Sequence, residues 1–200
     1  MTNRRPSNLD LKIVVLGPAG VGKTCLIHRF CNGEFLVSSM PTVGAGFFPH
    51  TMQIEDTEVS IMLWDTAGDE RFKSVIPSLL RGAQGLVLVY DVTSLQTFAD
   101  LNRYLDLFLD TAEYDPNAEY LPILLLGNKC DMEERDVPQE EINNWLRKNR
   151  VKYFKLVSAK TGEGIQDAFK DYLQMFVGWH EKSDIVAIPI DQTNEKKSCC

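Results

Sequence analysis

Apolar runs alternate with helical patterns along most of this 200-residue chain. Four runs have the length and composition of buried parallel strands: residues 11–16, 85–90, 123–126 and 154–157. Two further segments have strand composition and flank a short polar stretch, which predicts a β-hairpin: residues 47–54 and 59–64. Helices are expected over the remaining periodic segments: residues 23–31, 95–111, 139–149 and 164–179.

This alternation predicts an α/β fold, with a doubly wound, mostly parallel six-stranded sheet, one antiparallel edge strand and helices on both faces. We expect a flexible N-terminus over residues 1–8, one domain over residues 9–180 and a flexible tail over residues 181–200, because the periodicity fails from about Ser183 onward. Ligands of such a sheet bind at the carboxyl ends of its strands.

Composition and charge exclude several classes of function. The chain is 44% hydrophobic, which is enough to bury one core, and its formal net charge of -7 argues against a nucleic-acid surface. The polar start of the chain carries Arg4 and Arg5 without a following apolar run, so it lacks the pattern of a signal peptide. No segment approaches the roughly 18 apolar residues of a membrane-spanning helix. The five cysteines form neither a disulfide framework nor metal-ligand pairs.

The glycine-rich segment after the first strand has the pattern of a phosphate-binding loop. Residues 17–24 read Gly-Pro-Ala-Gly-Val-Gly-Lys-Thr, and their glycines let backbone N–H groups close around phosphates. Lys23 would neutralise phosphate charge and assist catalysis, and the Thr24 hydroxyl would bind Mg²⁺. The remaining candidate nucleotide-binding residues of this segment are Ala19, Gly20, Val21, Gly22 and Cys25. The loop predicts a P-loop NTPase but does not distinguish ATP from GTP.

A second motif, Asn128-Lys129-Cys130-Asp131, follows the buried run 123–126 and favours guanine. A carboxylate at Asp131 can accept hydrogen bonds from both N1–H and the 2-amino group of guanine, and adenine offers neither donor there. Asn128 would read the purine N7/O6 edge, and the stem of Lys129 would lie on the ring. A backbone donor to O6 would come from the segment Ser158, Ala159 and Lys160. By itself the motif could be a solvated turn, but its position after a buried strand favours a binding site.

The segment Asp65-Thr66-Ala67-Gly68 follows the second strand of the predicted hairpin. This position would place Asp65 near the phosphate loop, where its carboxylate would join the Mg²⁺ shell through a water molecule. The N–H of Gly68 would meet the γ-phosphate. A simple strand-end turn is the alternative, and the order of the three motifs argues against it.

These motifs give the chain a resemblance to the Ras superfamily, and most closely to the Rab family, over roughly residues 9–180. The most specific stretches are Trp-Asp-Thr-Ala-Gly-Asp-Glu-Arg-Phe at 64–72, Leu-Arg-Gly-Ala at 80–83, Leu-Val-Tyr-Asp-Val-Thr at 88–93 and Gly-Asn-Lys-Cys-Asp at 127–131. The interval between Asp131 and Ser158 has no room for the extra helix of the Rho family, which favours Rab.

The resemblance implies a GTP/GDP switch in vesicle trafficking, with Mg²⁺ as cofactor and a location on the cytoplasmic face of an intracellular membrane. It also implies an exchange factor, a GTPase-activating protein, effectors, and escort and GDP-dissociation-inhibitor proteins as partners. Loss of the γ-phosphate would release Thr42 and Gly68, and the segments around them would relax.

Further residue roles come from the resemblance alone. It implies that Phe35 packs on the guanine and that Thr42 binds Mg²⁺ and the γ-phosphate, although a core phenylalanine and a strand-entry threonine are alternatives. It assigns an effector surface to Phe47, Trp64 and Leu79, with core packing as the alternative for Trp64.

One residue departs from the family pattern. Asp69 stands at the catalytic position, where the family usually has a glutamine that orients the attacking water. An anionic side chain beside the γ-phosphate would be repelled, which predicts slow intrinsic hydrolysis. Two other classes stay open: a GTP-locked scaffold that recruits effectors, and a phosphate-loop kinase, for which we see no lid with arginines.

The last two residues, Cys199 and Cys200, resemble the double geranylgeranylation signal of Rab proteins. Two lipid chains anchor a protein stably, whereas one gives only marginal binding. The resemblance therefore implies prenylation of these thiols and a membrane anchor at the end of the tail.

Overall fold

The computed structural model describes residues 7–37, 40–68, 76–112, 114, 115 and 117–186. Three residues with predicted roles, Asp69, Cys199 and Cys200, lie outside this part of the chain.

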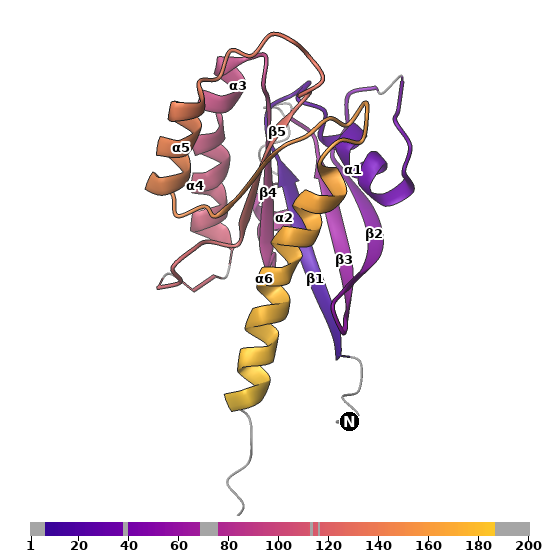
Figure 1. Ribbon diagram of the computed structural model, residues 1–200, viewed down its shortest axis with the longest axis vertical. Coiled ribbons are helices and arrows are strands. Elements are labelled where there is room, and N and C mark those ends of the chain that lie inside the picture. The colour runs from indigo at the N-terminus through magenta and orange to yellow at the C-terminus, as the bar shows by residue number, and fades with distance from the viewer. Residues whose placement is uncertain (1–6, 38–39, 69–75, 113, 116, 187–200) are drawn as a thin grey trace, which may run out of the picture.

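The six strands form one sheet in the order β2-β3-β1-β4-β5-β6 (Figure 1). Neighbouring strands run parallel except for the antiparallel pair β2 and β3, so β2 is the antiparallel edge strand that the pattern predicted. The strands span β1 Ser7–Leu16, β2 Ala45–Ile54, β3 Thr57–Thr66, β4 Gly85–Asp91, β5 Ile123–Asn128 and β6 Tyr153–Leu156.

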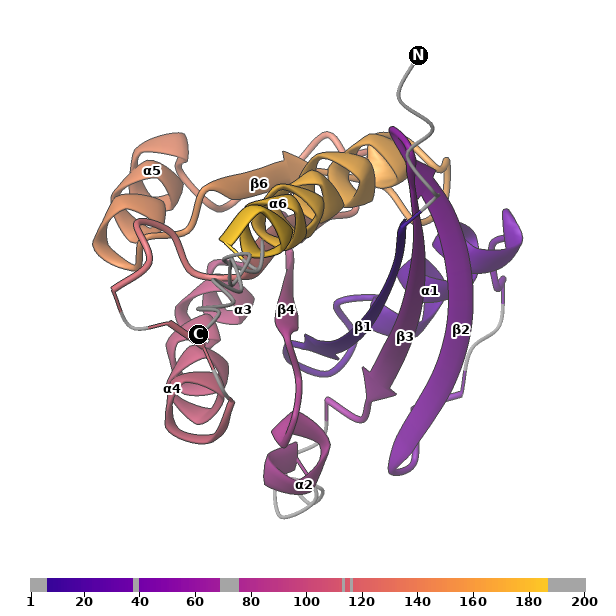
Figure 2. The ribbon, with the colours of Figure 1, turned by 90° about the horizontal axis from the view of Figure 1, so that it is seen from below.

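The helices cover both faces of the sheet (Figure 2). Their bounds are α1 Lys23–Asn32, α2 Ile76–Leu80, α3 Leu95–Ala99, α4 Leu101–Thr111, α5 Gln139–Lys148 and α6 Ile165–Val186. Buried residues of α1 and α6 form one core cluster with the sheet, and those of α2 to α5 form another. Alternate residues of β1 divide between these clusters, since Ile13 and Val15 belong to the first, and Val14 and Leu16 to the second.

Most predicted elements appear with shifted ends. The helix expected over residues 95–111 divides at Asp100, which keeps helical dihedral angles (φ −68°, ψ −14°). The short helix α2 was not predicted, because its five residues are too few to show a helical period.

The two ends of the domain also differ from the prediction. Strand β1 begins at Ser7, within the N-terminal segment that we expected to be flexible. Helix α6 continues to Val186, past its predicted end at residue 179 and into the predicted tail. This helix projects beyond the sheet at the end opposite the loops that follow the parallel strands (Figure 1). None of the described helices is both long and apolar enough to cross a membrane.

Strand β1 occupies the middle of the sheet, between β3 and β4. The chain continues from β1 to the β2–β3 pair on one side, and then crosses to β4 on the other side. The carboxyl end of β1 is therefore the topological switch point at which doubly wound sheets bind ligands. The glycine-rich loop follows β1 directly.

Candidate functional site

The loop between β1 and α1 packs so closely against its neighbours that glycine is required at two positions. A Cβ on Gly17 would lie 2.2 Å from the backbone oxygen of Val89 in β4. A Cβ on Gly22 would lie 2.5 Å from Nδ2 of Asn128, and Gly22 also has a left-handed backbone (φ 93°) as the N-cap of α1. The loop is thus held between β4 and the end of β5.

The Lys23 side chain closes this loop from inside. Its Nζ donates hydrogen bonds to the carbonyl oxygens of Gly17 and Pro18 at 2.8 and 2.9 Å, and the residue is buried. Burial lowers the pKa of Lys23 to about 8, although the Asp65 carboxylate acts in the opposite direction. An anionic polyphosphate at the loop would favour the charged form of this lysine.

Thr24, Thr42 and Asp65 come from three different segments and meet at one point. The Oγ1 atoms of the two threonines are 2.8 Å apart. Oδ2 of Asp65 accepts hydrogen bonds from Thr24 Oγ1 at 2.6 Å and from Thr42 Oγ1 at 3.3 Å. The predicted metal ligands are therefore brought together by the fold.

The chemistry of this cluster fits Mg²⁺, which prefers hard oxygen ligands. Oδ1 of Asp65 is buried and has no hydrogen-bond partner among the described residues. Such an orphaned carboxylate oxygen calls for a missing partner, and a bound cation or its water would supply one. Burial raises the pKa of Asp65, outweighing the hydrogen bond from Thr24 and the charge of Lys23, whereas a bound divalent cation would favour the carboxylate.

On the other side of the loop, Asn128 joins two segments. Its Nδ2 donates to the carbonyl oxygen of Val21 at 2.8 Å, and its Oδ1 accepts from the N–H of Ala159 at 3.0 Å. The side chain is buried, so this amide connects the phosphate loop to the 158–160 segment. This bridging role was not predicted from the sequence, and direct recognition of the purine edge by Asn128 stays a prediction.

The Asp131 carboxylate is held by its neighbours. Its Oδ1 accepts a hydrogen bond from Ser158 Oγ at 2.6 Å, and its Oδ2 lies 3.8 Å from Nζ of Lys160. Lys129 has a left-handed backbone (φ 70°), and its Nζ forms an ion pair with Asp91 at the end of β4. Lys129 and Asp131 of the predicted guanine motif are thus each held by neighbouring side chains.

Gly68 brings the end of β3 against the phosphate loop. A Cβ at this position would lie 2.4 Å from the backbone nitrogen of Ala19, so only glycine allows this approach. Phe35 contacts the core cluster of α1 and α6 and also borders the cavity. Core packing and the predicted packing on guanine are therefore compatible for this residue.

These segments enclose a cavity of about 570 Å³, a volume typical of ligand sites. The predicted nucleotide-binding residues that line it are Ala19, Gly20, Gly22, Lys23, Thr24, Cys25, Phe35, Thr42, Gly68, Asn128, Lys129, Asp131, Ala159 and Lys160. Val21 and Ser158 are buried and do not line the cavity, but each bonds to a residue that does: Val21 O accepts from Asn128, and Ser158 Oγ donates to Asp131.

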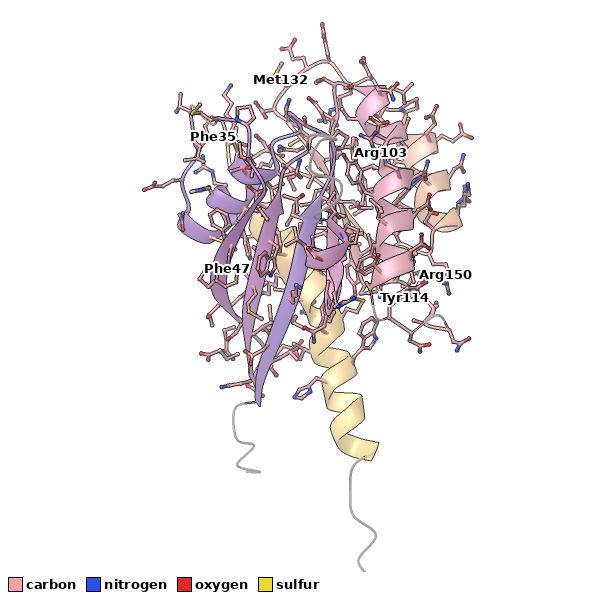
Figure 3. All side chains as sticks on the ribbon, turned by 180° about the vertical axis from the view of Figure 1, so that it is seen from behind. Phe35, Phe47, Arg103, Tyr114, Met132 and Arg150 are labelled. Carbon is pink, nitrogen blue, oxygen red and sulfur yellow. The ribbon has the colours of Figure 1, made fainter. Side chains whose placement is uncertain are left out.

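Four lining residues were not among the site residues predicted from the sequence: Met40, Pro41, Thr66 and Met132. Each lies within two positions of a predicted residue along the chain, and this proximity was the available signal. Figure 3 shows Phe35 and Met132 at the same end of the molecule.

Comparison with known proteins decides the family. The model of the Ras family matches residues 12–177. Relatives include the Ras-related protein Rab-7b of Bos taurus, 38% identical over 81% of this chain and 80% of the relative. The Ras-related protein Rab-7a of Paramecium octaurelia is 38% identical over 94% of this chain and 90% of the relative. The Ypt/Rab-type GTPase ypt7 of Schizosaccharomyces pombe is 36% identical over 94% of this chain and 95% of the relative.

The chain belongs to the Rab family of small GTPases.

The expected effector residues of this Rab lie on three elements, β2, β3 and α2. Phe47 and Trp64 are cross-strand partners of β2 and β3, with ring centroids 5.5 Å apart in an edge-to-face arrangement. Phe47 is 49% exposed, whereas Trp64 is partly buried against the core cluster of α2 to α5. The ring centroid of Trp64 lies 5.4 Å from Nζ of Lys12. Leu79 is a half-buried residue of α2. Phe47 is therefore available to a partner, and Trp64 combines core packing with partial exposure.

Proposed function

We propose that this Rab is a Mg²⁺-dependent switch that binds GTP and GDP, hydrolyses GTP and acts in vesicle trafficking. The observation that supports this best is the single cavity that combines the phosphate loop with the Asp131 carboxylate. A phosphate loop alone would accept any nucleoside triphosphate. The carboxylate adds acceptors that match the two donors of guanine and none of adenine.

Different residues of the cavity would bind the phosphates, the base and Mg²⁺. Lys23 and the backbone N–H groups of the loop would bind the phosphates, and Asp131 would accept from the N1–H and 2-amino groups of the base. Thr24, Thr42 and Asp65 would hold Mg²⁺, with Asp65 acting through water. When bound, the cation would neutralise charge on the β- and γ-phosphates. These proposed roles, together with membership of the Rab family, favour a GTP/GDP switch over a small-molecule kinase.

The segment that carries Thr42 has the character of a switch. Met40 is 88% exposed and Val43 is 80% exposed, so apolar packing contributes little to holding this segment. Its described ties are the hydrogen bonds of Thr42 to Thr24 and Asp65, and that from Ala67 N–H to Gly44 O at 3.0 Å. A segment with few buried contacts opens at low cost, so loss of the γ-phosphate would release it.

Asp69 bears on which state of the switch persists. Its carboxylate in place of glutamine favours slow intrinsic hydrolysis, and an activating protein would then supply the groups that accelerate turnover. The alternative function is a GTP-locked scaffold that recruits effectors. Nucleotide extracted from the purified protein separates the two, because mostly GDP supports the hydrolysing switch and mostly GTP supports the scaffold.

Membrane attachment is proposed through lipid on Cys199 and Cys200, on the cytoplasmic face of an intracellular membrane. The proposed partners are those of the family: exchange factor, activating protein, effectors, escort protein and GDP-dissociation inhibitor. Phe47 and Trp64 would contribute to the effector surface together with Leu79. Mass spectrometry of the C-terminus after expression in a eukaryotic host tests the lipid, since unmodified thiols on both cysteines contradict it.

The experiment that tests the nucleotide function is calorimetric titration of the Mg²⁺-supplied protein with GDP, GTP and ATP. Binding of GDP and GTP should exceed that of ATP by on the order of 10⁴. Removal of Mg²⁺ with a chelator should weaken GTP binding, because the phosphate charge is then less neutralised. Equal binding of ATP and GTP, or binding of neither, would contradict the proposal.

A further inference from the structure

We infer that Arg29 is a positioning residue for guanine recognition, because it fixes the 158–160 segment against α1. The inference rests on the proposed function, since it concerns how that nucleotide site keeps its shape. Arg29 lies in the last turn of α1, and its guanidinium donates to three carbonyl oxygens. Nε bonds to Ala159 O at 3.0 Å, Nη2 to Lys160 O at 2.7 Å and Nη1 to Gly33 O at 2.6 Å.

Two of these carbonyls belong to residues that line the cavity, Ala159 and Lys160. Ala159 is held from both sides, because its N–H donates to Asn128 Oδ1 at 3.0 Å and its carbonyl accepts from Arg29. The backbone donors of this segment are the groups expected to meet purine O6. Their position is therefore set by Asn128 from β5 and by Arg29 from α1.

Arginine suits this role better than another cation. Its planar fork presents several donors in a fixed geometry, which matches carbonyls of two separate segments, whereas a lysine offers a single mobile ammonium. The turn after the segment packs on the side-chain stem, since a Cβ at Gly162 would lie 3.5 Å from Arg29 Cδ. Gly162 also has a left-handed backbone (φ 90°), so the turn keeps this shape without strain.

The consequence follows from the position of α1. This helix begins at Lys23, at the end of the phosphate loop, and ends at Asn32, with Gly33 as its C-cap. Arg29 therefore connects the base-binding segment to the same rigid helix that carries the phosphate-binding lysine. Without the guanidinium, the donors facing the 6-position of the base would be held less rigidly relative to the phosphate loop, because the Asn128 amide would remain but the tie to α1 would be lost.

The test compares Arg29→Met, which keeps an unbranched apolar stem without donors, with Gln166→Ala as a matched control. Nε2 of Gln166 donates to Phe30 O at 3.0 Å, so the control removes a tie that joins α1 to α6 and does not involve residues 158–160. Three ligands are compared by dissociation rate and Kd: GDP, inosine diphosphate without the 2-amino group, and 6-thioguanosine diphosphate, whose sulfur is a weaker acceptor at the 6-position.

Arg29→Met should raise the GDP dissociation rate about tenfold, the scale of a lost charge-assisted hydrogen bond. It should also reduce the preference for GDP over 6-thioguanosine diphosphate. The preference for GDP over inosine diphosphate depends on Asp131 and should keep its wild-type value. Arg29→Lys should give intermediate values, and it carries the test if Arg29→Met does not fold.

The inference is overturned if the Arg29 variants retain the wild-type preference at the 6-position, or if Gln166→Ala changes that preference equally. A wild-type protein that binds no GDP would instead contradict the proposed function. Wild-type binding together with unaltered Arg29 variants contradicts only the role of Arg29.

Discussion

Ser158 Oγ donates a hydrogen bond of 2.6 Å to Oδ1 of Asp131. The same hydroxyl oxygen accepts from the N–H of Thr161 at 3.1 Å, so its orientation is fixed by the turn that follows β6. Ser158 is fully buried and adds no group to the cavity surface. Its contribution is to fix the rotamer of the carboxylate that is expected to select guanine.

Replacing Ser158 with alanine should therefore weaken GDP binding about tenfold, because a hydrogen bond to a charged group is lost and the carboxylate can rotate. The loss should be smaller for inosine diphosphate, which lacks the 2-amino donor to Asp131. Kd values from calorimetry check both statements. An equal loss for the two ligands would mean that Ser158 supports the fold of the loop rather than the carboxylate.

Asp69→Gln should accelerate single-turnover GTP hydrolysis. A carboxylate about 5 Å from one phosphate charge, at an effective dielectric constant of about 20, is repelled by about 3 kcal/mol. Part of this barrier should disappear with the charge, and glutamine can also orient water. Asp69→Asn is the matched control, because it removes the charge at unchanged length. If neither substitution increases the rate, the account of Asp69 is wrong.

Much of the fold was accessible from sequence because its signals are local. Apolar runs predicted four of the strands, and the hairpin pattern predicted the other two. Motifs at the strand ends predicted most of the cavity lining, since parallel strands bring their carboxyl ends to one edge. The bridging amide of Asn128 was not accessible in this way, because its partners lie in two other segments. Arg29 likewise bonds to a carbonyl 131 residues away, and no spacing rule indicates such a contact.

Tyr90 and Tyr172 form a natural pair for testing what buried hydroxyls contribute. Both side chains are fully buried. The hydroxyl of Tyr172 donates to Pro122 O at 2.8 Å, whereas the hydroxyl of Tyr90 has no partner among the described residues. A buried polar group without a partner costs on the order of 1–3 kcal/mol.

Tyr90→Phe should therefore leave the free energy of unfolding unchanged or raise it by about 1 kcal/mol, and Tyr172→Phe should lower it by about 1–2 kcal/mol. Urea unfolding of the GDP-bound protein measures both values at the same ligand concentration. A marked loss of stability in Tyr90→Phe would show that its hydroxyl has a partner, such as a buried water.

The ion pair of Asp91 with Lys129 should make stability depend on pH. Burial alone would raise the pKa of Asp91, but hydrogen bonds from Lys129 and Thr93 outweigh it and hold the pKa below its ordinary value. Because the folded state favours the ionised carboxylate, this contribution is fully present above the unfolded pKa of about 3.8. It is lost as the pH falls through the lower folded pKa.

Asp91→Asn keeps a side-chain oxygen for Thr93 but removes the charge that pairs with Lys129. At pH 7 the variant should be less stable than wild type by about 1 kcal/mol, since Lys129 is partly exposed and the pair is screened by solvent. The difference should stay constant down to about pH 5 and shrink as the pH falls below about 4, because the wild-type carboxylate is then protonated as well. Urea unfolding curves at a series of pH values measure this difference. If this difference in the free energy of unfolding keeps its neutral-pH value at pH 3.5 and below, the amide disrupts the site sterically. The charge of Asp91 would then contribute nothing to holding Lys129 beside the proposed guanine site.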